Sequence, residues 1–304
     1  MRKTSVYLPD VLKARLAEVA LRTGRSEAQL VRLALERLVA SEPAASGAGA
    51  GAGLGLGLRD DPVVARNRTG PCLVGVGMGP GDPGLITTRA VAALRAADRV
   101  LAPTTSASAV GRAEAIVREA APGVAVERVV FVMETDGAAR AAALAAVAER
   151  VVGLLDVGER VAFVTLGDPN VYSTFASVAA EVRSRRPAVP IESIPGIMAF
   201  QDLAARSGTV LVDGDERLVL VPAHRGDGEA AVAAAAADGH SAVVVYKGGS
   251  RLPELAATLA GAGRLDGAVL GELLGLPGGR VARVADVADR PATYLATLVV
   301  PPVR

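Results

Sequence analysis

The chain has 304 residues, of which 51% are hydrophobic, 21% charged and 3% aromatic, with a net charge of +1. This composition excludes a disordered or fibrous protein and leaves room for more than one structural unit. The single cysteine, Cys72, excludes an intramolecular disulfide and a thiolate metal cluster within the chain. No run of 18 apolar residues occurs and no apolar segment follows Arg2 and Lys3. We therefore expect a soluble, cytoplasmic protein without membrane contact.

Residues 1–40 predict a short strand followed by two helices. Residues 2–8 alternate as a half-buried strand does, and Pro9 ends the alternation. The next apolar positions recur at helical spacing before Gly24, a typical helix stop. Ser26 and Gln29 then form the S-x-x-Q pattern of a capping box, which predicts the start of the second helix. The first helix carries its apolar stripe at Leu12, Leu16, Val19 and Ala20, and the second at Leu30, Leu33, Ala34 and Leu38.

A unit of this size, with one strand, leaves both strand edges unpaired, so we expect it to dimerise. The segment resembles the ribbon-helix-helix family of DNA-binding domains, in which two such strands pair into a ribbon that enters the major groove. The resemblance implies that Lys3, Ser5 and Tyr7 point to the bases. Residues 1–40 also carry eight Lys/Arg against four Asp/Glu, a balance that suits an anionic partner. A dimerisation arm without DNA contact is the alternative.

Residues 41–70 predict a flexible linker rich in Gly and Ala. Within it, residues 47–58 alternate glycine with a small or aliphatic residue. Glycine at every second position costs too much backbone entropy for a stable helix or strand.

From residue 73, short apolar strands alternate with helical stretches, which predicts an α/β fold with mostly parallel sheets. The series divides into two α/β domains, 71–212 and 213–304. Strands are expected at 73–77, 99–102, 124–130, 160–165, 191–193, 218–221, 242–246, 267–270 and 294–299. Helices are expected at 86–97, 112–120, 140–155, 171–184, 229–237 and 252–260.

Three turns rich in glycine and proline each follow a predicted strand. They are G-V-G-M-G-P-G-D-P-G at 75–84, G-D-P at 167–169 and the turn at 194–200 that holds Pro195 and Gly196. The first turn contains G-x-G-x-x-G, but its prolines and the Asp82 carboxylate stand where a dinucleotide's phosphates would bind. Because the carboxyl ends of parallel strands meet at one sheet edge, the turns predict a small-molecule site there.

These motifs resemble those of the tetrapyrrole methyltransferases, and the resemblance spans residues 73–300. It rests on G-x-G-M-G-P-G-D-P-G-L-I-T, T-L-G-D-P-N-V-Y-S-T-F and I-P-G-I-M-A-F-Q in that order. The Y-S-T-F and S-I-P-G-I variants look most like the precorrin-2 C20-methyltransferase branch. The resemblance implies a homodimer of two-domain subunits that holds S-adenosylmethionine and a tetrapyrrole in the cleft between domains.

The resemblance also assigns residues. Asp168 suits the ammonium group of the cofactor, because such a contact is a charge-assisted hydrogen bond. Many relatives have Ser or Thr where Met198 stands, so we expect only main-chain or van der Waals contact there. The implied cofactor-binding set is Pro80, Gly81, Leu166, Gly167, Asp168, Ser173, Thr174, Met198, Ala199, Tyr246 and Lys247, with Leu274 and Gly275 as further candidates. The implied substrate set is Gly79, Pro80, Asp82 and Arg112.

The implied reaction is methyl transfer to C20 of precorrin-2, giving precorrin-3A in cobalamin biosynthesis. Asp168 and Tyr172 are the candidates to accept the proton that the ring carbon loses. Candidates to receive the substrate's carboxylates are Arg89, Arg112, Arg206 and Arg225. His224 and His240 stand 16 positions apart, so no metal site is expected.

Two alternatives remain open at this level. The first is the cobalt-containing form of the same substrate. The second is a DNA-binding regulator that senses a corrinoid or S-adenosylmethionine through a degenerate methylase domain.

Overall fold

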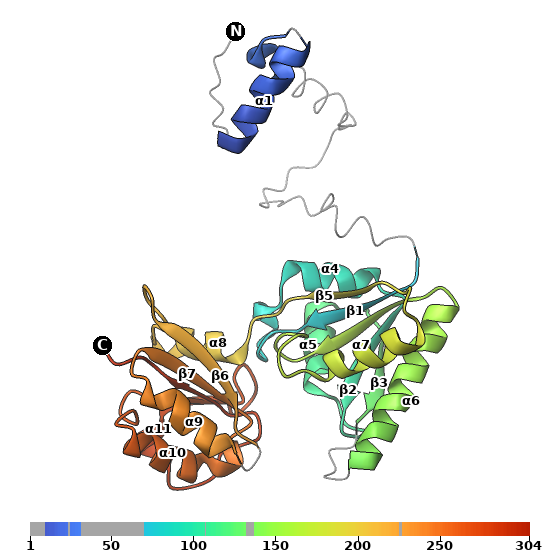
Figure 1. The fold of residues 1–304 in the computed structure, drawn as a ribbon. Helices are drawn as coiled ribbons and strands as arrows, with labels where there is room; N and C mark the ends of the chain where they lie inside the picture. The colour runs from blue at the N-terminus through green and yellow to red at the C-terminus, as the bar shows by residue number, and fades with distance from the viewer. Residues whose placement is uncertain (1–9, 24, 32–69, 107, 132–136, 225–226) are drawn as a thin grey trace, which may run out of the picture. The chain divides into compact units, whose positions relative to one another are not determined.

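The structure is a computed structural model that describes residues 10–23, 25–31, 70–106, 108–131, 137–224 and 227–304. The chain divides into two compact units, Met1–Leu56 and Gly57–Arg304. Both units can be followed in Figure 1.

In the first unit the described residues form helix α1, Asp10–Thr23, and the helical residues 27–31. The amide of Ser26 donates to Gln29 Oε1 at 2.9 Å, and the amide of Gln29 donates to Ser26 Oγ at 3.3 Å. These reciprocal bonds confirm the predicted capping box. The predicted strand with Lys3, Ser5 and Tyr7, and the linker up to residue 69, lie outside the described residues.

The second unit begins with a five-stranded parallel sheet in the order β3-β2-β4-β1-β5. Its strands are β1 Cys72–Gly77, β2 Arg99–Thr104, β3 Val126–Val130, β4 Arg160–Thr165 and β5 Ile191–Ile194. Every residue of β1 is buried. A continuous apolar run is expected for a central strand that helices cover on both faces.

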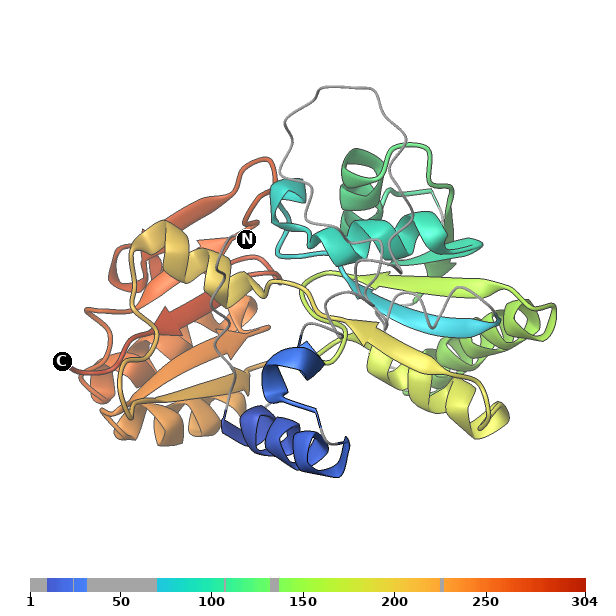
Figure 2. The ribbon, with the colours of Figure 1, turned by 90° about the horizontal axis from the view of Figure 1, so that it is seen from above.

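Helices cover both faces of this first sheet (Figures 1 and 2). Helices α4, Thr88–Ala96, and α5, Arg112–Ala120, pack on one face. Helices α6, Gly137–Asp156, and α7, Thr174–Arg185, pack on the other. A 3₁₀ turn, η1 at Pro83–Leu85, follows β1.

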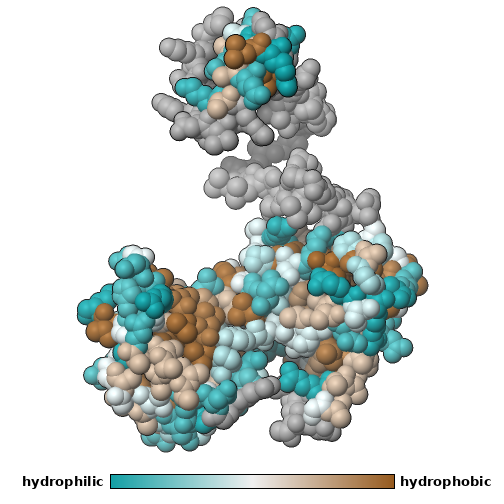
Figure 3. Space-filling model, viewed as in Figure 1, coloured by the Kyte–Doolittle hydropathy of each residue, from teal (hydrophilic) through white to brown (hydrophobic). Residues whose placement is uncertain are grey.

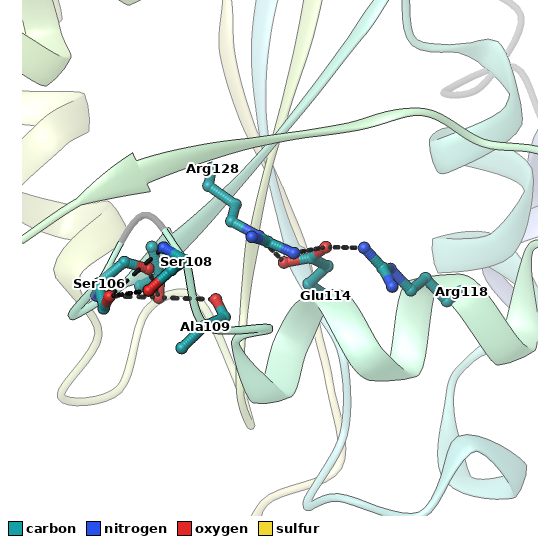
Figure 4. A network of polar contacts seen from close by, with 7 residues as sticks. Ser106, Ser108, Ala109, Glu114, Arg118 and Arg128 are labelled. Carbon is teal, nitrogen blue, oxygen red and sulfur yellow. Dashed lines mark hydrogen bonds and ion pairs between the residues drawn. The ribbon is translucent and has the colours of Figure 1, made fainter.

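A buried carboxylate fastens α5 to the edge strand β3 (Figure 4). Glu114 has 2% of its side chain exposed. It accepts from Arg128 Nε at 2.6 Å and from Arg118 Nη2 at 2.5 Å. Because a buried charge is tolerated only when it is paired and hydrogen-bonded, these two arginines make the burial of Glu114 possible.

The second sheet has the order β6-β7-β10-β8-β9. Its strands are β6 Arg217–Pro222, β7 Ser241–Tyr246, β8 Val269–Glu272, β9 Arg280–Arg283 and β10 Thr297–Val300. Only the β6–β7 pair is parallel, and the other three pairs are antiparallel. The expectation of mostly parallel sheets is therefore confirmed for the first sheet and wrong for the second, because β10 inserts antiparallel between β7 and β8.

One face of the second sheet packs against α9, Gly228–Ala237, α10, Leu252–Gly261, and α11, Val284–Val287, after the 3₁₀ turn η2 at Gly249–Arg251. The other face packs against α8, Ala199–Ser207. The sequence reading did not predict α8, β9 or α11.

Apolar surface gathers on the C-terminal part of the second unit in Figure 3, where β6 and β7 lie in Figure 1. Leu218 and Leu220 on β6 are half-buried and pack against the cluster around Phe200. Among the described residues, no helix is both long and apolar enough to cross a membrane.

Candidate functional site

The three glycine turns predicted from the sequence meet backbone to backbone at the carboxyl edge of the first sheet. The amide of Gly167 donates to the carbonyl of Gly79 at 2.7 Å. A Cβ on Gly77 would lie 2.5 Å from the nitrogen of Gly196 and 2.7 Å from the carbonyl oxygen of Gly167. Residues with a side chain cannot approach this closely, which explains glycine at these positions.

The carboxylate of Asp168 ties the second turn to the third. One oxygen accepts from the amide of Asn170 at 2.8 Å, and the other accepts from the amide of Gly196 at 3.1 Å. Asp168 does not line the cavity described below. Its predicted contact with the cofactor's ammonium group stays a prediction, and these bonds give it a second role in positioning the turns.

The first turn also touches the loop that follows β8. A Cβ on Gly81 would collide with the carbonyl oxygen of Leu274, and a Cβ on Gly275 would collide with the amide nitrogen of Asp82. Gly275 has φ of +69°, a conformation that glycine adopts at little cost. The N-terminal and C-terminal parts of this unit therefore meet through main-chain contact.

A cavity of about 290 Å³ lies where these loops meet. Its size is close to the lower end of the range typical of small-molecule sites. The N-terminal ends of α7 and α8 and the residues that follow β4, β7 and β8 all contribute to its wall. It is lined by Pro80, Thr165, Leu166, Gly167, Val171, Tyr172, Ser173, Thr174, Met198, Ala199, Tyr246, Lys247, Leu273, Leu274, Leu276 and Tyr294 to Thr297.

The cavity wall contains strained backbone. Within the described ranges, Tyr172, Lys247 and Leu273 are the non-glycine residues with positive φ, at 50°, 59° and 49°. All three line the cavity. Each such conformation costs on the order of 1–3 kcal/mol and clusters at functional sites, so this coincidence independently marks the cavity as the candidate site.

Polar and aromatic contacts hold these strained residues in place. The hydroxyl of Tyr172 donates to the carbonyl of Leu220 at 3.1 Å. Lys247 Nζ lies 3.5 Å from the carbonyl oxygen of Tyr172 and 5.9 Å from the centre of its ring. The rings of Tyr172 and Tyr246 meet edge to face, with centroids 5.8 Å apart. Residues from the two parts of the unit therefore interlock over the cavity.

Burial shifts the pKa of three side chains in the cavity wall. It raises the pKa of both Tyr172 and Tyr246 above the ordinary value of 10.0. Both phenols consequently stay protonated near neutral pH. Burial, with a smaller contribution from Arg140, lowers the pKa of Lys247 below 10.5.

Most of the residues implied as cofactor-binding line the cavity. They are Pro80, Leu166, Gly167, Ser173, Thr174, Met198, Ala199, Tyr246 and Lys247, joined by Leu274 and by the catalytic candidate Tyr172. Gly79, Gly81 and Asp82 lie in the adjoining turn, and Gly79 bonds Gly167. Arg112 is exposed at the first turn of α5 and does not line the cavity.

Sequence reasoning missed part of the wall, namely Thr165, Val171, Leu273, Leu276 and the segment from Tyr294 to Thr297. The last segment was expected to begin a strand, but β10 begins at Thr297. The buried carboxylate of Glu272 accepts from the amide of Thr293 at 2.7 Å and so anchors this segment. No local sequence motif predicts that the segment from Tyr294 to Thr297 lines the cavity.

A family model described as Tetrapyrrole (Corrin/Porphyrin) Methylases matches residues 72–287. The chain belongs to this family. Methylases of this kind take their methyl group from S-adenosylmethionine, so the chain is a methyltransferase that depends on this cofactor.

Two curated tetrapyrrole methylases match this chain over nearly their whole length. A precorrin-2 C(20)-methyltransferase of Sinorhizobium sp. is 35% identical over 238 residues, which cover 75% of this chain and 94% of the relative. A cobalt-precorrin-2 C(20)-methyltransferase of Salmonella typhimurium is 31% identical over 233 residues, which cover 75% and 95%.

Solved structures share the fold of this methylase. The methyltransferase CobJ superposes with a TM-score of 0.57 at 19% identity, covering 77% of this chain and 95% of that one. The cobalt precorrin-4 methyltransferase CbiF gives the same TM-score and identity, covering 75% and 94%. At this identity the likeness concerns the fold alone.

Proposed function

We propose that this methylase transfers a methyl group from S-adenosylmethionine to C20 of precorrin-2 or of its cobalt form, a step of cobalamin biosynthesis. The observation that carries the proposal is a cavity built from the three family turns and marked by strained backbone. The two C20-methyltransferases, matched along more than nine-tenths of their length, support this choice of substrate.

The cavity residues fit the cofactor. Helices α7 and α8 both begin at its wall, with Ser173 and Met198 as their N-cap residues. Helix N-terminal amides favour an anion such as the methionine carboxylate. Met198 brings no hydroxyl to cap α8, while the Ser173 hydroxyl caps the amide of Phe175 at 3.0 Å. Tyr172, Tyr246 and the leucines of the wall offer apolar surface to the adenosyl group.

The protein's contribution is mainly positioning. The cofactor supplies an electrophilic methyl group when bound, and the reacting ring carbon is itself the nucleophile. Closely packed turns and the paired rings of Tyr172 and Tyr246 give a wall that can fix the orientation of both partners. Orientation of this kind can supply on the order of 7 kcal/mol or more. The hydroxyl of Tyr172 donates a hydrogen bond to the carbonyl of Leu220 and burial raises its pKa, so Tyr172 suits a positioning role better than a basic one.

The deciding experiment is mass spectrometry of the purified full-length protein after incubation with S-adenosylmethionine and either precorrin-2 or its cobalt form. We expect a mass gain of one methyl group on one form. That form identifies whether the enzyme serves the metal-free or the cobalt-containing branch of the pathway. Cofactor binding without a methylated product from either form would contradict the proposal and favour the regulator.

Two expectations about partners remain proposals. We propose that the chain forms a homodimer, to be tested by light scattering of the protein as it elutes from a size-exclusion column.

We also propose that residues 1–40 contact DNA, since the described part of this segment exposes Lys13, Arg22 and Arg25. Binding through phosphates must weaken steeply with salt, and a salt-independent interaction would contradict it.

A further inference from the structure

Arg206, on the last turn of α8, lies between two carboxylates of different burial. Its Nε donates to Asp202 Oδ1 at 2.8 Å, one helical turn away on α8. Its Nη2 lies 3.7 Å from Oδ2 of Asp82, in the turn after β1. The Asp202 side chain is 6% exposed, whereas that of Asp82 is 44% exposed.

The buried partner holds the guanidinium in place. The second oxygen of Asp202 is buried without a hydrogen bond among the described residues. Moving Arg206 away would leave this buried carboxylate uncompensated, which is costly. Asp202 therefore fixes the guanidinium of Arg206 on α8. This helix packs with Leu274 in one buried cluster through Phe200 and Leu203, so Arg206 joins the side of the 274–276 loop to Asp82.

Asp82 lies where the 79–84 turn meets the 274–276 loop, two segments that form part of the cavity wall. Its Oδ1 accepts from the amide of Gly84 at 2.8 Å and shapes the turn, which leaves Oδ2 for Arg206. Its amide nitrogen lies directly against Gly275. Pro80 on one side of this contact and Leu274 and Leu276 on the other all line the cavity.

We infer that Arg206 is a positioning residue for methyl transfer: by pairing with Asp82 it holds the 79–84 turn against the 274–276 loop and keeps the cavity wall closed. The inference rests on the proposed function only in taking the reaction to be methyl transfer; the contact between Arg206 and Asp82 is independent of it. It replaces the sequence-based expectation that Arg206 receives a substrate carboxylate, because two protein carboxylates already face its guanidinium.

The test is amide hydrogen exchange of the full-length protein without ligands. Asp82→Asn is the sharp variant, because an amide oxygen can still accept from Gly84 while the charge that attracts Arg206 is lost. We expect Asp82→Asn to raise exchange of residues 81–85 and 275–276 about two- to fivefold, the range for a half-exposed ion pair. Arg206→Gln should raise it at least as much, because it also leaves the buried carboxylate of Asp202 without its partner. The double variant should exchange no faster than Arg206→Gln, and Arg206→Lys should restore part of the protection.

Arg304→Gln is the matched control, since Arg304 is as exposed as Arg206 and pairs with a carboxylate that is 11% exposed, Glu216, while neither residue lines the cavity. It should leave exchange at 81–85 unchanged. Raising the salt concentration should bring the wild-type exchange toward that of Arg206→Gln, because salt screens exposed pairs.

Steady-state methyl transfer then separates the two roles of Arg206. A positioning role predicts that Asp82→Asn and Arg206→Gln both lower kcat/KM, and that the double variant falls no lower than Arg206→Gln. If Arg206→Gln alone raised KM for the tetrapyrrole while exchange stayed at the wild-type rate in both variants, Arg206 would be a substrate ligand and the inference would be overturned. Absence of methyl transfer with altered exchange would instead count against the proposed function alone.

Discussion

Asp168 is the residue whose two proposed roles can be separated by substitution. Its carboxylate accepts from two main-chain amides, and its charge suits the cofactor's ammonium group. We expect Asp168→Ala to weaken S-adenosylmethionine binding at least about tenfold, or about 1.4 kcal/mol, with the fold intact. Titration calorimetry with circular dichroism checks both points, and an unchanged titration would remove Asp168 from the site.

Asp168→Asn separates charge from position. The Asn side chain keeps one acceptor oxygen for an amide but has no charge. Affinity close to the wild type in this variant would indicate that Asp168 acts by positioning the turns. Affinity as low as in Asp168→Ala would indicate that one retained bond to an amide is not enough, and that the charge or the second bond is required.

Tyr172→Phe tests whether the phenol accepts a proton. Burial raises the pKa of Tyr172 above 10.0, so its neutral form dominates at every pH below that value. We expect Tyr172→Phe to reduce methyl transfer only about two- to fivefold, through loss of the bond to Leu220 worth roughly 0.5–1 kcal/mol. The pH–rate profile from pH 6 to 9 should keep its shape. Loss of a rising limb in the variant would identify Tyr172 as the base.

The residues that the sequence located share one physical signal: glycine or proline directly after a buried strand. That signal predicted a site at the turns 75–84, 167–169 and 194–200. The resemblance to the tetrapyrrole methyltransferases then implied Pro80, Gly167 and Met198, which line the cavity. Tyr294 and Leu273 carry no such signal, because tertiary contacts of a different sheet bring them to the wall. The strain at Leu273 is visible only in its φ of 49°.

At the scale of elements, the backbone contact between turns predicts opposite effects for two Gly→Ala variants. Gly77→Ala places a methyl group 2.5 Å from the nitrogen of Gly196 and should lower stability by about 2 kcal/mol or more. Gly153→Ala, within α6, meets nothing within 4 Å and should raise stability by about 0.5–1 kcal/mol. Urea unfolding of both variants measures the difference. Equal effects would contradict the close approach at Gly77.

The ion pairs of Glu114 that link α5 to β3 should make the free energy of unfolding depend on pH in the acidic range. A hydrogen bond from Arg128 is the largest cause that lowers the pKa of Glu114 below 4.5, and the charge of Arg118 adds to it. A folded pKa below the unfolded one means that this contribution is present above about pH 4.5 and lost as pH falls through the lowered value. Glu114→Gln should cost roughly 2 kcal/mol at pH 7 and less at pH 3. Urea midpoints at both pH values check this, and an equal loss would contradict it.

The elements themselves were predictable where local pattern dominates. Strand β4 and helix α5 have the expected bounds, because β4 is a continuous apolar run and α5 has a clear period of 3.6 residues. Helix α8 escaped detection because its first residues lie in the third motif turn, which reads as a loop. The antiparallel pairing of β10 was hidden as well, since strand direction depends on which neighbours the chain finds after folding.

At the scale of the whole molecule, the methylase and residues 1–40 should act independently. The family model begins at residue 72, and both sheets and the cavity lie in residues 72–300. A chain of residues 71–304 should therefore retain methyl transfer within about twofold of the full-length protein. Product formation measured by mass spectrometry under saturating S-adenosylmethionine gives the comparison.

The complementary variant leaves the methylase whole and alters the segment predicted to contact DNA. Lys3→Ala combined with Tyr7→Ala should abolish the salt-dependent binding of DNA, since a lost phosphate or base contact acts only at that interface. Its methyl transfer should equal that of the unaltered chain. If methyl transfer collapsed in this double variant while residues 71–304 alone stayed active, the N-terminal segment would restrain the enzyme. Ligand-dependent DNA binding would then be the next quantity to measure, because it separates a restrained enzyme from a regulator.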